Sequence, residues 1–162
     1  MTIRSKAAQG PVRVHDRIDI PESTREAWQK TVDIMADIIG VPAALIMRVR
    51  DEEQLEVFVA SQTPGNIFAQ GETAQRDSGL FCEHAMESGS LMLIPNAADD
   101  PTFTESAAVR RGMISYLGLP LLWPDGRPFG SICVMDSREN RYSARYERLL
   151  TQFQEIVNLH LA

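Results

Sequence analysis

Apolar residues recur at spacings of three and four in two long segments, one toward each end of the chain. The first segment follows Pro21-Glu22-Ser23 and ends at Gly40, and its apolar face comprises Trp28, Val32, Met35, Ala36 and Ile39. The second follows Ser143, and its apolar stripe comprises Tyr146, Leu149, Leu150, Phe153, Ile156 and Val157. A period near 3.6 residues is typical of amphipathic helices, so the pattern predicts two long helices.

Alternating apolar and polar positions predict two β-hairpins. Residues 43–50 alternate, with Arg48 opposite the apolar side, and residues 54–60 return after a charged turn. A second hairpin joins residues 115–122 to 127–136 through a Pro-Asp-Gly turn. Consecutive hairpins favour a largely antiparallel sheet.

The segment between the hairpins is more polar. Residues 61–77 contain several glycine and proline positions and predict a long loop of the kind that covers a site. Short helices are expected over 79–88 and 104–112, with a strand at 91–95 between them. We therefore expect an α+β domain with both long helices on one face of the sheet. The short helices and loops would cover the other face.

Composition narrows the class of protein. The chain has 162 residues, a net charge of −6 and 44% hydrophobic residues, which predicts one globular domain and disfavours nucleic acid as a partner. No apolar run reaches the roughly 18 residues of a membrane span, so no membrane insertion is expected. Residues 1–20 are interpreted as a basic, partly disordered arm, and residues 21–162 as the domain. Two cysteines outside any CxxC motif favour a reduced, cytoplasmic protein.

Candidate chemistry is sparse. Cys82 and His84 are two positions apart, so on a helix they point in different directions and form no local catalytic dyad. Cys82 is interpreted as a small buried residue beneath a covering helix, or as a residue that lines a pocket or senses oxidation. Cys133 lies within a strand and is expected in the core. Three histidines without clustered spacing predict no metal site.

Arg48 poses a different question, because an arginine in the middle of a strand reaches either solvent or a cavity. It either reaches solvent or an internal carboxylate, or it meets the carboxylate or phosphate of a ligand in a cavity. If its side of the sheet is the covered one, Phe58, Asn96, Ser115 and Tyr116 would lie near it. Aromatic walls with a few polar groups suit a small-molecule pocket and also an ordinary core.

Three stretches of this sequence are similar in order and spacing to one family. They are Gly79-Leu80-Phe81-Cys82-Glu83, then Pro95-Asn96-Ala97, and the hairpin from Gly118-Leu119-Pro120-Leu121 through Trp123-Pro124-Asp125-Gly126 to Phe129-Gly130-Ser131-Ile132. They resemble the GAF domain of bacterial signalling proteins, found beside histidine kinase and GGDEF output domains. The resemblance implies a GAF-like (profilin-like) sheet between long dimerisation helices and a ligand-side layer. It names no cofactor, because GAF domains share a scaffold rather than a chemistry.

The first hypothesis is a regulatory module without catalysis of its own. A small ligand or a redox event would settle the loops around residues 61–82 and 96–113 and shift the long helices. The shifted helices would pass the signal to a partner or to a kinase or cyclase output domain. The expected pocket comprises Arg48, Phe58, Leu80, Cys82, Glu83, Asn96, Ser115 and Tyr116. The expected homodimer interface comprises Trp28, Val32, Met35, Phe153, Ile156 and Val157.

Two alternatives stay open. The resemblance also extends to a GAF subfamily that reduces free methionine-R-sulfoxide with pocket cysteines; that activity would need a nucleophilic and a resolving cysteine. Cys82 fits a suitable position, whereas Cys133 is expected within a strand. The last alternative is a dimerisation module with a collapsed pocket, which predicts no ligand-sized cavity.

Overall fold

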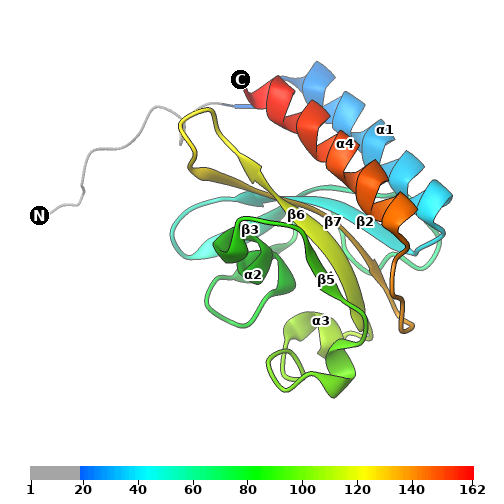
Figure 1. The fold of residues 1–162 in the computed structure, drawn as a ribbon. Helices are drawn as coiled ribbons and strands as arrows, with labels where there is room; N and C mark the ends of the chain where they lie inside the picture. Colours follow the sequence, from blue (N-terminus) through cyan, green and yellow to red (C-terminus); the bar gives the residue numbers. More distant parts are fainter. Residues whose placement is uncertain (1–18) are drawn as a thin grey trace, which may run out of the picture.

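The sheet has six strands in the order β4-β3-β2-β7-β6-β5, and every neighbouring pair is antiparallel (Figure 1). The computed structural model describes residues 19–162, so the predicted arm lies outside the described residues except for its last two. The strands are β2 (Ala43–Val49), β3 (Gln54–Ala60), β4 (Thr73–Gln75), β5 (Met92–Ile94), β6 (Ser115–Leu122) and β7 (Pro128–Asp136). The antiparallel α+β architecture predicted from the two hairpins is confirmed.

The two central strands, β2 and β7, approach each other closely. Their register places Ala43 opposite Met135 and Arg48 opposite Gly130. A side chain at Gly130 would collide with the main-chain carbonyl of Met47, so the close approach requires glycine there. The β6–β7 turn has Gly126 at φ 90°, as the Pro-Asp-Gly pattern predicts.

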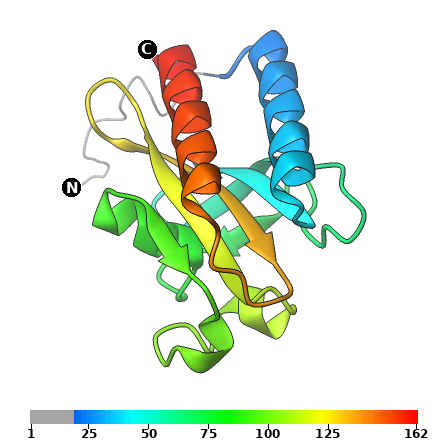
Figure 2. The same cartoon turned by 45° about the vertical axis from the view of Figure 1, so that its right-hand side comes forward.

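The long helices α1 (Glu22–Ile39) and α4 (Ala144–Leu161) lie side by side on one face of the sheet, as Figures 1 and 2 show. Gly40 adopts the left-handed conformation that ends α1, with φ 78°. The Trp28 indole donates a hydrogen bond of 2.8 Å to Nδ1 of His160 and thereby joins the start of α1 to the end of α4.

An aromatic cluster fills the core on this helix face. Trp28, Phe58 and Phe129 are almost fully buried, with ring centroids 5.7 Å apart for both tryptophan pairs and 6.2 Å for the two phenylalanines. Edge-on packing of large rings buries much apolar area at a favourable geometry. This cluster therefore holds α1 and the sheet together. The predicted face of α1 is confirmed, since Trp28, Val32, Met35, Ala36 and Ile39 are all buried.

The opposite face is covered by short elements. They are α2 (Phe81–Ser88), a 3-10 turn at Ala97–Asp99 and α3 (Ala107–Arg110), which lie below the sheet in Figure 1. A second core between them and the sheet contains Leu45, Met47 and Met135 from the strands. The predicted loop over 61–77 is only partly right, because three of its residues form the edge strand β4.

Candidate ligand-binding site

Alternation along the strands decides which residues face the second core. In β2, Leu45 and Met47 point toward α2, whereas Ile46 belongs to the helix-face core. A cavity of about 70 Å³ remains between the sheet and α2. Its lining is mostly apolar and includes Leu45, Met47, Val57, Phe68, Leu80, Phe81, Cys82 and Met135.

Arg111, directly after α3, joins two segments that cover this cavity. Its guanidinium pairs with the Glu72 carboxylate and donates a 2.7 Å hydrogen bond to the carbonyl oxygen of Ile67. It also lies 4.8 Å from the centroid of the Phe68 ring. Arg111 therefore ties the loop before β4 to α3 across the mouth of the cavity.

A buried ion pair fixes α2 from the same side. Arg76 approaches both carboxylate oxygens of Glu83, with Nε at 3.3 and 3.1 Å and Nη2 at 2.9 Å. The pKa of Arg76 is raised, chiefly by this hydrogen bond with Glu83. Because Glu83 is buried, the pair supplies the partner that a buried carboxylate requires. Glu83 thus anchors α2 rather than facing the cavity.

The two cysteines of the chain meet beneath α2. Both are free and buried, and the interaction between their side chains lowers the pKa of Cys82 and raises that of Cys133. The hydroxyls of Tyr116 and Ser131 lie close to this pair, but neither makes a hydrogen bond of good geometry. Burial raises the pKa of the Tyr116 phenol well above its usual range. A buried polar group without a partner is costly, which marks this spot as unusual.

Several predicted pocket residues lie elsewhere. Arg48 and Phe58 are on the helix face, where Arg48 pairs with Glu56 at 2.8 Å and stacks on the Phe58 ring at 4.4 Å. Ser115 and Tyr116 are neighbours in one strand and so point to opposite faces. The Ser115 hydroxyl accordingly bonds the Tyr142 hydroxyl at 3.0 Å, on the helix face.

Asn96 is also outside the cavity. Its side-chain oxygen accepts a 3.0 Å hydrogen bond from the main-chain amide of Ala98, and its amide group contacts Asp99 and Glu139. It therefore caps the 3-10 turn, a role typical of asparagine.

Of the predicted pocket residues, Leu80 and Cys82 line the cavity, whereas Tyr116 and Glu83 are buried but do not line it. The sequence reasoning missed Met47, Phe68, Arg111 and Met135. The alternation of β2 and β7 could have indicated the two methionines, once the face turned toward α2 was known. Nothing in the local pattern around Arg111 signals its long-range pairing with Glu72.

The predicted dimer residues also need correction. Trp28, Val32, Met35 and Val157 are fully buried against the sheet and cannot form an outer interface. Phe153 is half-buried, and Ile156 remains 43% exposed. The exposed apolar residues of the two helices are instead Ile34, Ile38, Ile156 and Leu159. An amphipathic face read from sequence is the face turned toward the protein's own core.

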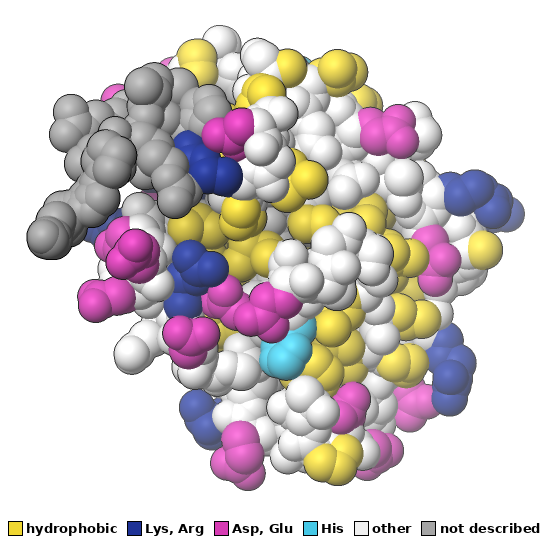
Figure 3. Space-filling view, turned by 60° about the vertical axis from the view of Figure 1, so that its left-hand side comes forward, with side chains coloured by type: hydrophobic (Ala, Val, Ile, Leu, Met, Phe, Trp, Pro, Cys, Tyr) yellow, Lys and Arg dark blue, Asp and Glu magenta, His cyan; other side chains and the backbone are white. Residues whose placement is uncertain are grey.

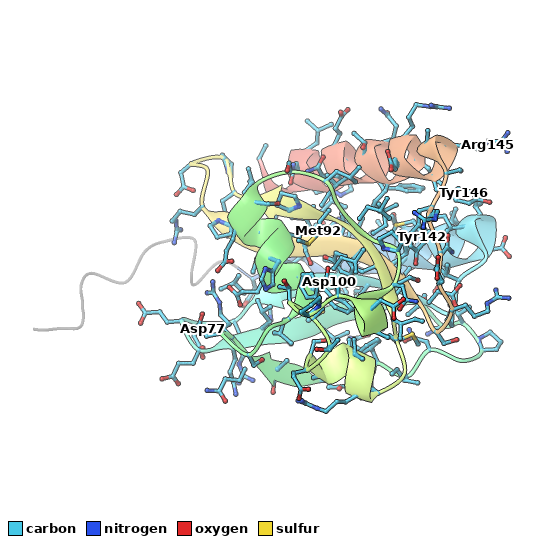
Figure 4. The ribbon with its side chains drawn as sticks, turned by 60° about the horizontal axis from the view of Figure 1, so that its bottom comes forward. Asp77, Met92, Asp100, Tyr142, Arg145 and Tyr146 are labelled. Carbon is cyan, nitrogen blue, oxygen red and sulfur yellow. The ribbon has the colours of Figure 1, made fainter. Side chains whose placement is uncertain are left out.

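A larger depression of about 610 Å³ lies at the start of α4. It is open to solvent, and its walls include Ile38, Leu91, Arg145 and Tyr146. Figure 4 shows Arg145 and Tyr146 at the beginning of α4, near the segment that carries Tyr142. This depression belongs to the helix side of the molecule.

The described surface shows neither a metal cluster nor a membrane helix. Across residues 19–162, no three His, Cys, Asp or Glu side chains gather closely enough to hold a metal ion. Within the same range, no helix is both long and apolar enough to cross a membrane. Figure 3 shows a band of exposed hydrophobic side chains on one face, bordered by acidic and basic ones.

The described chain is thus an antiparallel sheet with long helices on one face and a roofed cavity on the other. The sequence model of the GAF domain matches residues 21–161, and the chain belongs to the GAF-domain family. Among curated protein sequences, none matches it significantly.

Solved structures share the fold at low sequence identity. The GAF domain of a phosphoenolpyruvate-protein phosphotransferase from Acinetobacter has a TM-score of 0.67 and 17% identity, over 85% of this chain and 81% of that one. A type II free methionine-R-sulfoxide reductase from Thermoplasma acidophilum has a TM-score of 0.67 and 13% identity, over 88% of this chain and 95% of that one. The chromophore-binding domain of Stigmatella aurantiaca phytochrome P1 has a TM-score of 0.69 and 16% identity, over 91% of this chain and 56% of that one.

Proposed function

We propose that this GAF domain is a regulatory sensor without catalysis of its own, which responds to a small molecule bound under α2. The observation that carries the proposal is the apolar cavity enclosed between the sheet and α2, on the face opposite the terminal helices. The phytochrome neighbour is by name a chromophore-binding domain, which supports the binding of a small molecule by this fold.

The sheet offers a short route from the cavity to the terminal helices. Met47 and Met135 line the cavity, while their strand neighbours Ile46 and Val134 pack in the helix-face core. A ligand that favours one position of β2 and β7 would therefore favour one position of α1 and α4. The helices would pass this change to a partner or to a fused kinase or cyclase output domain in bacterial signal transduction. We also propose that the protein is cytoplasmic, because free thiols such as those of Cys82 and Cys133 are typical of a reducing compartment.

The test is a melting screen with a library of small metabolites. A ligand that binds the folded state raises the melting temperature, by an amount set by its concentration relative to Kd. We expect at least one compound to raise the melting temperature of the wild type. The increase should be smaller in Leu80→Trp, because the larger side chain fills the cavity. The control is Leu93→Trp, at an exposed position of β5. A library that stabilises neither the wild type nor the control would contradict ligand sensing.

The contact between Cys82 and Cys133 favours a second candidate, redox sensing. The Cys82 thiolate would attack one oxygen of hydrogen peroxide, break the O–O bond and become a sulfenic acid, with hydroxide leaving as water after protonation. The Cys133 thiol would then attack that sulfur, form the disulfide and release a second water. Two thiols thereby lose two electrons to one peroxide.

Peroxide treatment and intact mass spectrometry test this candidate. A disulfide lowers the mass by two hydrogens, and Cys133→Ser should instead leave a sulfenic acid that a dimedone probe captures. Unchanged thiols after exposure to excess peroxide would remove the redox candidate and leave ligand sensing unaffected.

The enzyme alternative requires two cysteines close together, and Cys133 does lie beside Cys82 although it belongs to a strand. The reductase neighbour shares the fold only, at 13% identity. We nevertheless propose no catalysis, because the thiols are buried beneath α2 and the cavity of about 70 Å³ leaves little room for a substrate. Sustained thiol-dependent turnover of free methionine-R-sulfoxide, lost in Cys82→Ser, would overturn this.

We also propose that α1 and α4 form a homodimer through exposed Ile34, Ile38, Ile156 and Leu159. These residues leave apolar area in water on the outer side of both helices, and the depression at the start of α4 adjoins Ile38. Light scattering at high micromolar concentration tests this. We expect a dimer that Ile156→Asp with Leu159→Asp converts to a monomer; a wild-type monomer would contradict the dimer.

The small volume of the cavity also favours a third candidate, a dimerisation module with a collapsed pocket. It predicts a dimer by light scattering and no response in the melting screen, so the two measurements together separate it from ligand sensing.

A further inference from the structure

We infer that Arg111 is the residue that selects the ligand, and that this ligand is a small apolar molecule with one carboxylate. The inference rests on the proposed ligand-sensing function and assigns the chemistry of the same cavity. It is carried by the contacts of Arg111 at the cavity mouth.

Arg111 connects the two segments that roof the cavity. It follows α3, while its partners Ile67, Phe68 and Glu72 all belong to the loop that leads into β4. These residues are about 40 positions apart in sequence, and the ion pair with Glu72 spans 39. Both segments cover the same apolar core, so separating Arg111 from Glu72 loosens the roof at Glu72.

The polarity of the cavity indicates one head group at its mouth. Its walls are mostly aliphatic, aromatic or thioether side chains, and the charged residues in its lining are Glu72 and Arg111. An apolar body therefore fits the interior, whereas a charged group is tolerated where those two residues meet. The ligand must consequently be apolar at one end and polar at the other.

A carboxylate fits this mouth better than an ammonium group does. A ligand carboxylate that replaces Glu72 keeps Arg111 on the Ile67 carbonyl and on the Phe68 ring. A ligand cation that replaces Arg111 breaks both of those contacts as well as the ion pair. Glu72 also has a second partner after displacement, because its other carboxylate oxygen accepts a 3.1 Å hydrogen bond from the amide of Ala69. The planar guanidinium has five donors and suits a carboxylate geometrically.

The size of the cavity makes this exchange necessary. About 70 Å³ is roughly half the volume of a cavity of about 150 Å³ that binds benzene, and it is less than any drug-sized ligand requires. Binding must therefore enlarge the cavity, and the roof gives way at the Arg111–Glu72 pair while Arg111 stays on Ile67 and Phe68. A molecule that offers Arg111 a new carboxylate compensates for the ion pair that opening breaks.

The experiment uses protein labelled with ¹³C at the methionine methyl groups. Met47 and Met135 line the cavity and report binding there, whereas Met35 lies in the helix-face core and serves as the internal control. The probes are phenylacetate, phenylacetamide and 2-phenylethylammonium, which share a ring and differ in head group. We expect phenylacetate to shift the Met47 and Met135 signals, at a Kd at least tenfold below those of the other two.

Three variants sharpen the result. Arg111→Gln should weaken phenylacetate binding at least tenfold, while Arg110→Gln should leave it unchanged. Arg110 is the matched control because it adjoins Arg111, is exposed and contacts only the carbonyl of Glu105 by side-chain hydrogen bond among the described residues. Glu72→Gln removes the competing carboxylate and should strengthen phenylacetate binding several-fold. An unchanged Met35 signal shows that each variant is folded.

Other outcomes overturn the inference. Equal or tighter binding of the amide or the ammonium probe would show that the site does not select a carboxylate. An equal loss in Arg110→Gln would show attraction to general positive charge instead of a defined site. If no probe moves Met47 or Met135, this ligand class is wrong; a compound from the melting screen that moves them would still support ligand sensing.

Discussion

The two faces of the sheet are built from the same strands but are filled in opposite ways. The helix face holds the interlocked rings of Trp28, Phe58 and Phe129, and its buried Tyr142 hydroxyl is bonded to Ser115. The α2 face holds a cavity, and its buried Tyr116 hydroxyl makes no hydrogen bond of good geometry. The first face is therefore well packed and well bonded, whereas the second keeps costly features that the proposed binding function would explain.

The largest expected difference between the faces comes from removing a core ring. Trp28→Ala should lower the free energy of unfolding by about 3–5 kcal/mol, because nothing near the aromatic cluster can fill the space. The matched change on the other face, Leu80→Ala, extends an existing cavity and should cost about 2 kcal/mol. Urea unfolding followed by circular dichroism measures both. Equal losses would contradict the contrast between a filled and an unfilled core.

The next effect concerns the ion pair that anchors α2. Arg76→Ala leaves the buried Glu83 carboxylate without its partner and should lower stability by about 2–3 kcal/mol. Arg138→Ala is the control, because Arg138 is largely exposed and lies 3.8 Å from Asp136, so its loss should be below about 1 kcal/mol. Thermal melting separates the two, and a similar small loss for both would show that α2 does not depend on Arg76.

Alkaline pH probes both faces at once. Burial raises the pKa of Tyr116 and of Tyr142, so folding favours the protonated phenols. This stability is fully present below the unfolded pKa near 10 and is lost as pH rises above it, by up to about 1.4 kcal/mol per pH unit and tyrosine. Unfolding from pH 9 to 11.5 should show the slope, and Tyr116→Phe with Tyr142→Phe should reduce it. An unaltered slope would contradict this assignment.

The smallest effect separates the two buried hydroxyls at neutral pH. Tyr142→Phe breaks the 3.0 Å bond to Ser115 and should cost about 1 kcal/mol. Tyr116→Phe removes a hydroxyl that lacks a well-formed bond and should be neutral or stabilising. Melting temperatures compare the variants. A loss in Tyr116→Phe as large as that in Tyr142→Phe would mean that the Tyr116 hydroxyl is as well satisfied.

Regular periodicity made most of the fold predictable. The buried face of α1, its end at Gly40 and both hairpins follow from patterns that local chemistry sets. The edge strand β4 was missed because three residues leave no period to detect. The candidate site was less predictable: Leu80 and Cys82 were found, but Arg48 was placed on the wrong face.

The wrong assignments share one cause. Alternation tells which residues of a strand point the same way, but not which of the two faces carries the long helices. Once α1 and α4 cover the side of Ile46 and Phe58, Arg48 must lie with them and Met47 must face the cavity. The predicted dimer interface was wrong for a similar reason. An apolar helix stripe such as that of Trp28 and Val32 packs against the protein's own sheet and is not available to a partner.

The amino-acid sequence determined the two long helices, the hairpin strands and their antiparallel pairing, because each depends on neighbours within a few positions. Only the tertiary structure decided which face became the cavity, that Arg111 meets Glu72, and that Cys82 meets Cys133. These pairings join residues about 40 to 50 positions apart, whose approach depends on how the whole chain packs.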